Sequence, residues 1–280
     1  METGQNFMTQ SKTNNNVFTN KSWSVQVSLT GLSFLGPSQS QGAVYLSEQF
    51  PVATTAQGLT QYLDQFWGRQ REILNVQAHQ NIRLVHQSSW YTVVPKALFD
   101  PARGLDYLKF NTRLLDNDLV AYDTIEALDL VVVYLPFTNV NNWFFERFGS
   151  FTFEHSVSVL LRHLLAQNTV VNNVQSMIYL YKDNFDFIVW QDKNLLMSNT
   201  YNFQAPEDVL YYVLFGFEQF DLNPEQIPLA IAGSVSEQSE IFDLLFKYVR
   251  NVSLYSQGPR PIKDLAQHQE LPLQCISQLG

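Results

Sequence analysis

Residues 24–35 have the sequence SVQVSLTGLSFL, in which apolar and polar side chains alternate on both sides of Thr30-Gly31. Alternation with a period of two is typical of strands that bury one face, and a glycine between two such runs indicates a tight turn. We therefore predict a β-hairpin. A third strand is predicted at residues 43–46, and the apolar spacing from Leu59 to Phe66 predicts an amphipathic helix over residues 54–74, capped by Thr54 or Thr55.

The remainder of the first half predicts further strands. Residues 82–94 read as extended structure that ends at Pro95, and residues 96–99 as a short helical turn. Residues 130–135 form a continuous apolar run, which is typical of a strand buried on both faces. This run predicts a central strand of a mixed or parallel sheet.

The same order of elements recurs in the second half. Residues 175–181 and 185–190 predict a second hairpin, residues 194–197 a third strand, residues 206–220 a helix, residues 229–232 a buried strand closed by Gly233, and residues 241–249 a final helix. Sliding one half over the other by about 150 residues superposes these patterns, which is the signature of an internal duplication. Between the halves, residues 151–153 predict a strand and residues 156–165 a helix.

Two aromatic-rich helices raise the question of what covers them. Residues 141–148 contain one tryptophan and three phenylalanines, and side chains at successive helical positions cannot all face one core. One of these rings is then either an exposed interface anchor or covered by a second layer of the core. Residues 209–217 are apolar on every side, and we expect this helix to be buried between the sheet and neighbouring helices.

The composition excludes several classes of protein. The 25 Gln and 21 Asn residues give 46 amides, more than the 43 charged residues, which are 17 Lys+Arg and 26 Asp+Glu. The net charge of −9 without a basic cluster excludes a nucleic-acid partner. The longest apolar stretch is about half a membrane span, and the first residues do not resemble a leader, so we expect a cytoplasmic protein without membrane insertion. The single Cys275 excludes an intrachain disulfide.

The order of elements, hairpin, third strand, helix, strand and helix in each half, resembles the actin-like ATPase fold, an α/β fold with mixed sheets in two RNase H-like halves. The chain most resembles a bacterial family of uncharacterised proteins assigned to that fold, over roughly residues 22–256. The strings that carry the resemblance are residues 24–34, residues 92–99, and residues 199–203 with Asp208 and Tyr211-Tyr212. It implies RNase H-like halves at 22–149 and 150–256. The amide-rich composition of the two ends predicts a loose tail at 1–21 and a C-terminal tail at 257–280.

The resemblance also implies where a nucleotide would bind. Active members of the superfamily carry an Asp followed by glycines in each first hairpin turn, and a Gly-Gly turn near the adenosine, so that backbone N–H groups approach the phosphates and a carboxylate holds magnesium. The matching positions here are Thr30-Gly31, Asp183-Asn184 and Gly233-Ser234. The first turn lacks the acid, the second lacks glycine, and we expect Phe185 to crowd a phosphate. These residues predict a vestigial nucleotide cleft.

Each of these positions also has a structural explanation. Asp183 is a common turn residue whose side chain can cap its own backbone. Ser234 and Glu237 have the spacing of a capping box for the last helix, in which Gly233 only lets the strand turn. We expect these structural roles.

The sequence contains no motif for metal-dependent or nucleophilic catalysis. The five histidines show no metal-ligand spacing, and Asp183 and Asp186 differ by an odd number of residues, so a regular strand would point them to opposite faces. Cys275 lies in the C-terminal tail, where a nucleophilic role is not expected. No nucleophile elbow, Walker loop or dinucleotide fingerprint is present.

The first functional hypothesis is therefore a non-catalytic protein of actin-like fold that acts as a scaffold or adaptor for an unknown protein partner, with no cofactor expected. The alternative is a nucleotide-binding protein or phosphotransferase that holds Mg-ATP with altered phosphate loops between its halves. An RNase H-like nuclease ranks last, because its acids do not converge and the chain lacks a basic face.

Overall fold

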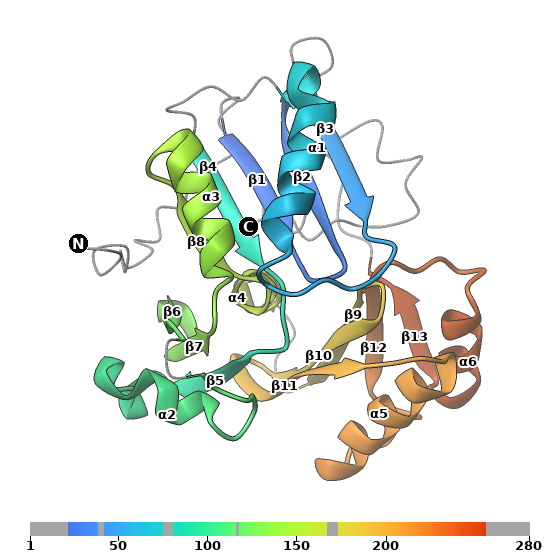
Figure 1. Cartoon of the computed structure of the whole chain (residues 1–280). Coiled ribbons are helices and arrows are strands. Elements are labelled where there is room, and N and C mark those ends of the chain that lie inside the picture. The colour runs from blue at the N-terminus through green and yellow to red at the C-terminus, as the bar shows by residue number, and fades with distance from the viewer. Residues whose placement is uncertain (1–21, 39–41, 75–80, 116–117, 167–172, 256–280) are drawn as a thin grey trace. The chain divides into compact units, whose positions relative to one another are not determined.

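The computed structural model describes residues 22–38, 42–74, 81–115, 118–166 and 173–255 (Figure 1). The predicted tails lie outside these residues, as do His79, His268 and Cys275. The chain divides into two compact units after Arg162. Among the described residues, no helix combines the length and apolarity that a membrane crossing requires.

The first unit contains a five-stranded sheet with the strand order β3-β2-β1-β4-β8. Its strands are β1 (Ser22–Val27), β2 (Gly31–Ser38), β3 (Gly42–Gln49), β4 (Asn81–His86) and β8 (Thr152–His155). β1 is antiparallel to β2 and parallel to β4, and β4 is parallel to β8. The predicted first hairpin and third strand are confirmed.

Helix α1 (Leu59–Leu74) begins later than predicted. The predicted start at Thr54 is wrong because the backbone N–H of Thr54 donates to the carbonyl of Leu29, 2.8 Å away, which holds this residue against the first hairpin turn. The Thr55 hydroxyl accepts from the N–H of Gly58 at 3.3 Å, just before the helix. Leu59, Leu63 and Phe66 then pack into the core, as their spacing predicts.

Helix α3 (Thr138–Phe148) buries most of its aromatic side chains in the core of the first unit. Trp143, Phe144 and Phe148 are buried beside α1, and only Phe145 is exposed. The indole N–H of Trp143 donates to the Asp64 carboxylate at 2.8 Å, so its polar edge is also satisfied. Of the two predicted alternatives, the exposed ring is the one observed: Phe145 is in solvent, and the other three rings belong to the core.

A small antiparallel sheet with the order β5-β7-β6 completes the first unit. Its strands are β5 (Tyr91–Pro95), β6 (Ala121–Ile125) and β7 (Leu130–Tyr134), and its helical segments are α2 (Gly104–Leu108), η1 (Lys96–Leu98), η2 (Pro101–Arg103) and η3 (Glu126–Leu128). The helical turn predicted at residues 96–99 is confirmed. The extended stretch 82–94 is two strands in two sheets.

The apolar run 130–135 is a central strand, as predicted, but its sheet is antiparallel and not mixed or parallel. Its strong burial arises because Val131 and Val133 pack in a cluster with Leu108 of α2, while Val132 and Tyr134 on the other face are buried as well. A strand buried on both faces shows the same continuous apolar sequence whether its neighbouring strands are parallel or antiparallel.

The boundary drawn at residues 149/150 assigned β8 to the second half, but β8 pairs with β4 of the first sheet. The reason is the aromatic contact that continues from α3, because the Phe144 and Phe151 rings lie 5.9 Å apart and Phe151 contacts Phe153. Helix α4 (Ser156–Ala166) follows β8 directly and extends across the division between the two units.

The second unit contains a sheet with the order β11-β10-β9-β12-β13, which repeats the topology of the first. Its strands are β9 (Val174–Leu180), β10 (Asn184–Gln191), β11 (Asn194–Asn202), β12 (Pro228–Gly233) and β13 (Asn251–Leu254), and its helices are α5 (Pro206–Gln219) and α6 (Glu240–Tyr248). The second hairpin and both helices are where the periodicity predicts them. A shared topology is what a duplication would produce, and the origin of the repeat stays a prediction.

Helix α5 is not buried all round, contrary to the prediction. Val209, Val213 and Phe217 face the sheet and are fully buried, whereas Tyr211 is 61% exposed and Phe215 is 41% exposed. No further layer covers the outer face of α5 within the part of the chain that the structure describes, so apolar residues on that face are left in solvent.

Candidate functional site

The first hairpin turn is closed by its own serine. The N–H groups of Thr30 and Gly31 both donate to Ser28 Oγ, at 3.2 and 3.0 Å. The Ser28 hydroxyl lies 3.1 Å from the Gly31 carbonyl, and the N–H of Ser28 donates to the same carbonyl at 2.9 Å. The donors that would approach a phosphate in an active superfamily member are thus engaged within the turn.

The carbonyls of this turn are engaged as well. The N–H of Phe50 donates to the Thr30 carbonyl, and the N–H of Thr54 to the Leu29 carbonyl, both at 2.8 Å. Ser28 and Thr30 are consequently almost fully buried. A Cβ on Gly31 would lie 2.8 Å from the Glu48 carbonyl, so this glycine is explained by the close approach of β3.

In the second hairpin turn, the carboxylate of Asp183 bonds a neighbouring side chain. Asp183 Oδ1 accepts from the Asn184 side-chain amide at 2.9 Å, and the Asp183 carbonyl accepts from the N–H of Phe203 at 3.0 Å. The expected steric role of Phe185 is wrong, because its ring is fully buried in the core of the second unit, where it contacts Tyr201 and Tyr212. Position 185 begins the alternation of β10 and faces inward.

Gly233 and Ser234 lie at the same end of the second sheet as the second turn. The N–H of Ser234 donates to the Leu180 carbonyl at 2.9 Å, next to the turn that begins at Tyr181. Asp183, Asn184, Gly233 and Ser234 are therefore gathered at this end of the sheet, while Thr30 and Gly31 belong to the first unit.

The capping box predicted for Ser234 and Glu237 is wrong. Helix α6 begins at Glu240, and its N-cap is Ser239, whose Oγ accepts from the N–H of Phe242 at 3.3 Å. The helix starts late because Val235 packs into the core directly after the strand, which keeps this segment out of helical conformation.

Gly233 is required at its position. Its φ is +87°, and a Cβ there would lie 2.0 Å from the Leu180 carbonyl oxygen. We expect Gly233→Ala to lower the free energy of unfolding by about 1–3 kcal/mol from backbone strain, with the steric overlap adding to that loss. Gly149→Ala is the matched control, because Gly149 also has a positive φ, +76°, but a Cβ at that position would meet no atom within 4 Å. Equal losses in urea unfolding of the two variants would contradict the role of the Leu180 contact.

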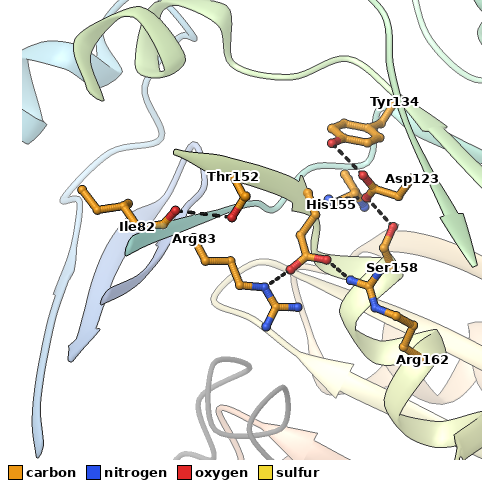
Figure 2. Close-up of polar contacts among 9 residues, drawn as sticks. Ile82, Arg83, Asp123, Tyr134, Thr152, His155, Ser158 and Arg162 are labelled. Carbon is orange, nitrogen blue, oxygen red and sulfur yellow. Dashed lines mark hydrogen bonds and ion pairs between the residues drawn. The ribbon is translucent and has the colours of Figure 1, made fainter. Parts of the chain in front are cut away.

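A buried polar cluster in the first unit gathers ionisable groups that sequence patterns did not reveal (Figure 2). Asp123 of β6 is 2% exposed and accepts three hydrogen bonds, from the N–H of His155 at 2.8 Å, Ser158 Oγ at 2.6 Å and the Tyr134 hydroxyl at 3.2 Å. Burial raises the pKa of the Asp123 carboxyl, and these donors partly offset that effect. Asp123 of the small sheet thereby bonds the last residue of β8 and a side chain in the first turn of α4.

Glu154 of β8 is the second buried carboxylate of the cluster. It forms ion pairs with Arg83 of β4 and Arg162 of α4, one guanidinium on each carboxylate oxygen (Figure 2). The Glu154 side chain is 6% exposed, whereas the side chains of Arg83 and Arg162 are 36% and 22% exposed, so the carboxylate is buried and the guanidinium groups are partly in solvent. Together the two acids tie β4, β8, α4 and the small sheet into one unit.

Ser88, His155 and Asp123 lie near one another but do not form a nucleophilic triad. His155 Nδ1 accepts from the N–H of Val157 at 3.2 Å, so its Nε2 carries the proton and faces Ser88 Oγ, 3.4 Å away. A histidine in this tautomer cannot take the serine proton at Nε2, and Asp123 bonds the backbone of His155 and not its ring.

Two further buried ionisable residues, His86 and Asp186, lie outside this cluster. Nδ1 of His86 accepts from the N–H of Phe137 at 3.3 Å, and its Nε2–H donates to the side-chain oxygen Oδ1 of Asn141 at 3.0 Å. Asp186 of β10 bonds the Tyr181 hydroxyl at 2.8 Å and the Thr200 hydroxyl at 2.5 Å. In the described ranges, no three His, Cys, Asp or Glu residues lie close enough together to hold a metal ion.

Two five-stranded sheets of identical strand order, each opening with an antiparallel hairpin, define a protein of the actin-like ATPase fold. A crystal structure of a Bacteroides thetaiotaomicron protein with actin-like ATPase fold and unknown function is similar to this chain, with a TM-score of 0.74 and 17% identity over 93% of this chain and 96% of that chain. A chain of the PilM-PilN type IV pilus biogenesis complex is similar with a TM-score of 0.56 and 13% identity, over 92% of this chain and 96% of that one.

The chain belongs to the DUF3822 family, described as a protein of unknown function, whose model matches residues 10–252. No curated protein is significantly similar to it in sequence. The resemblance inferred from the strings of residues above is thus confirmed at the level of family and fold.

Proposed function

We propose that this protein is a non-catalytic member of the actin-like fold that acts by binding another protein. The observation that carries the proposal is the first hairpin turn, in which Ser28 Oγ occupies the N–H groups of Thr30 and Gly31. A phosphate oxygen at this position would have to displace the serine hydroxyl, and no carboxylate of the turn would accompany it to hold magnesium.

Two observations support a protein partner. Exposed aromatic side chains are typical anchors of protein interfaces, and the second unit carries several of them on its helices. The similar fold in the PilM-PilN complex shows that this architecture occurs in a protein assembly. The proposal includes a cytoplasmic location, in keeping with a single cysteine in 280 residues.

Thermal unfolding in the presence of Mg-ATP, Mg-ADP and Mg-GTP tests the proposal. A nucleotide bound at 100 times its dissociation constant would add about 2.7 kcal/mol of stability, which is a shift of several degrees for a chain of this size. We expect shifts below about 1 °C and no phosphate release. Mg-dependent phosphate release that Asp183→Ala abolishes, and that the exposed-loop variant Glu225→Ala retains, would overturn the proposal.

One observation favours the alternative of a nucleotide-binding protein or phosphotransferase with altered phosphate loops. Asp183, Asn184, Gly233 and Ser234 lie together at one end of the second sheet, as the superfamily's chemistry would need. A nucleotide held only through these residues would give the thermal shift without phosphate release. The same titration therefore separates the two functions.

A further inference from the structure

The outer face of the second unit carries an aromatic surface with an acidic border. Tyr211 and Phe215 project from α5, and Phe246 projects from α6, with 61%, 41% and 60% of their surfaces exposed. Tyr248, two positions after Phe246, lies on another side of α6. We call Tyr211, Phe215 and Phe246 the aromatic surface. Their neighbours Val209, Val213 and Leu245 are buried in a single core, so both helices cover the same face of the sheet (Figure 1). Monomeric proteins seldom leave such large apolar rings together in solvent.

The exposed rings are held in place by stacking. The Tyr211 and Phe215 rings are stacked with centroids 6.0 Å apart, and Tyr211 contacts Tyr212, which stacks on Tyr201 at 4.3 Å. On α6, Phe246 stacks on the half-buried Phe242. Side chains fixed in this way lose little conformational freedom on binding, which favours an interface over incidental exposure.

Charge determines what can cover this surface. The exposed acids on the two helices are Glu207, Glu218, Glu240 and Asp243, whereas α5 carries no basic residue and α6 carries only Lys247. An anionic membrane or a nucleic acid would be repelled. A second copy that used the same face would bring like charges together across a two-fold axis.

We propose that the aromatic surface binds a cationic amphipathic helix of another protein. Tyr211 and Phe215 are four residues apart on a helix, a rise of about 6 Å, which matches apolar anchors at i and i+4 of a partner helix. Lysine or arginine residues that flank those anchors would meet the acidic border. This inference rests on the proposed function and specifies the chemistry of its partner.

Fluorescence polarisation with synthetic peptides tests the inference on the full chain. The probes are an 18-residue Leu/Lys peptide of helical periodicity, the same residues scrambled to remove that periodicity, and a Leu/Glu peptide of the first pattern. We expect binding of the periodic Leu/Lys peptide only, weakened by added salt. The double variant Tyr211→Ser/Phe246→Ser should weaken it at least tenfold. Binding of the Leu/Glu peptide, or equal binding of the scrambled one, would overturn the inference.

Phe110→Ser is the matched control, because Phe110 is the most exposed aromatic of the first unit, at 84%. We expect this variant to bind the peptide as the natural chain does, and all variants to keep their melting temperature since the changed side chains are exposed. An equal loss of binding in Phe110→Ser, or a dimer in solution that Tyr211→Ser/Phe246→Ser dissociates, would also overturn the inference. The nucleotide titrations are unaffected by these outcomes, so failure here is distinguishable from failure of the proposed function.

Discussion

Glu154→Ala should lower the free energy of unfolding of the first unit by about 3–5 kcal/mol. The variant removes the carboxylate that both Arg83 and Arg162 share, and it leaves two guanidinium groups near each other without their common partner. The remaining buried acid, Asp123, is already engaged with His155, Ser158 and Tyr134. An uncompensated charge in such a site costs far more than the net value of the ion pair.

Urea unfolding followed by tryptophan fluorescence measures this loss, because four of the five tryptophans belong to the first unit: Trp23, Trp67, Trp90 and Trp143. Glu126→Ala is the matched control. Glu126 pairs with Lys96 on the surface, where both side chains are well exposed, and the expected loss is below about 1 kcal/mol. Similar losses in the two variants would show that the Glu154 cluster does not hold the unit together.

His86 and His155 should remain neutral in the folded protein at pH 5.5, where an unperturbed histidine is mostly protonated. Burial lowers the pKa of His86 to about 4 and that of His155 to about 3. The donation of a backbone N–H into Nδ1 of each ring agrees with this, because protonation would break that bond. The Nε2–H tautomer is expected in the NMR spectra of both rings, and titration of either ring near pH 6.5 would refute the assignment.

The sign of the effect on stability follows from proton binding. Below about pH 6.5 the unfolded chain binds a proton on each histidine while the folded chain does not, so each one removes about 1.4 kcal/mol per pH unit on acidification, down to its folded pKa. Asp186, whose pKa burial raises to about 6, acts in the opposite direction between about pH 6 and 3.8. Burial also raises the pKa of Asp123, so this carboxyl opposes the histidines as well. Removing one opposing group with Asp186→Asn should therefore steepen the loss of stability on acidification.

The sequence predicted the elements of this fold because their signals are local. The hairpin of β1 and β2 and that of β9 and β10 follow from alternation around a turn, and α5 follows from Pro206 and its apolar period. The pairing of β8 with β4 was not predictable, since it depends on aromatic contacts between Phe144 and Phe151 that leave no periodic trace. The direction of the strands beside β7 was missed because a strand buried on both faces shows the same apolar run beside parallel and antiparallel neighbours.

Less of the candidate site was predictable. Thr30, Gly31, Asp183 and Gly233 were found through the family resemblance, but the residue that closes the first turn, Ser28, reads as an ordinary strand position. Its only sequence signal is a serine two residues before Thr30-Gly31, where a hydroxyl can cap the turn. The cluster of Asp123, Glu154 and Arg162 is assembled from distant segments, and no spacing could reveal it.

The amide signals of Thr30 and Gly31 in ¹H–¹⁵N NMR spectra test the central claim most directly. These two N–H groups are the donors that the actin-like fold would offer to a phosphate, and in this protein Ser28 Oγ accepts from both. We predict that neither signal moves when millimolar Mg-ATP is added. Saturable shifts of both signals, with the same dependence on magnesium, would show that a nucleotide displaces the serine and would contradict the account.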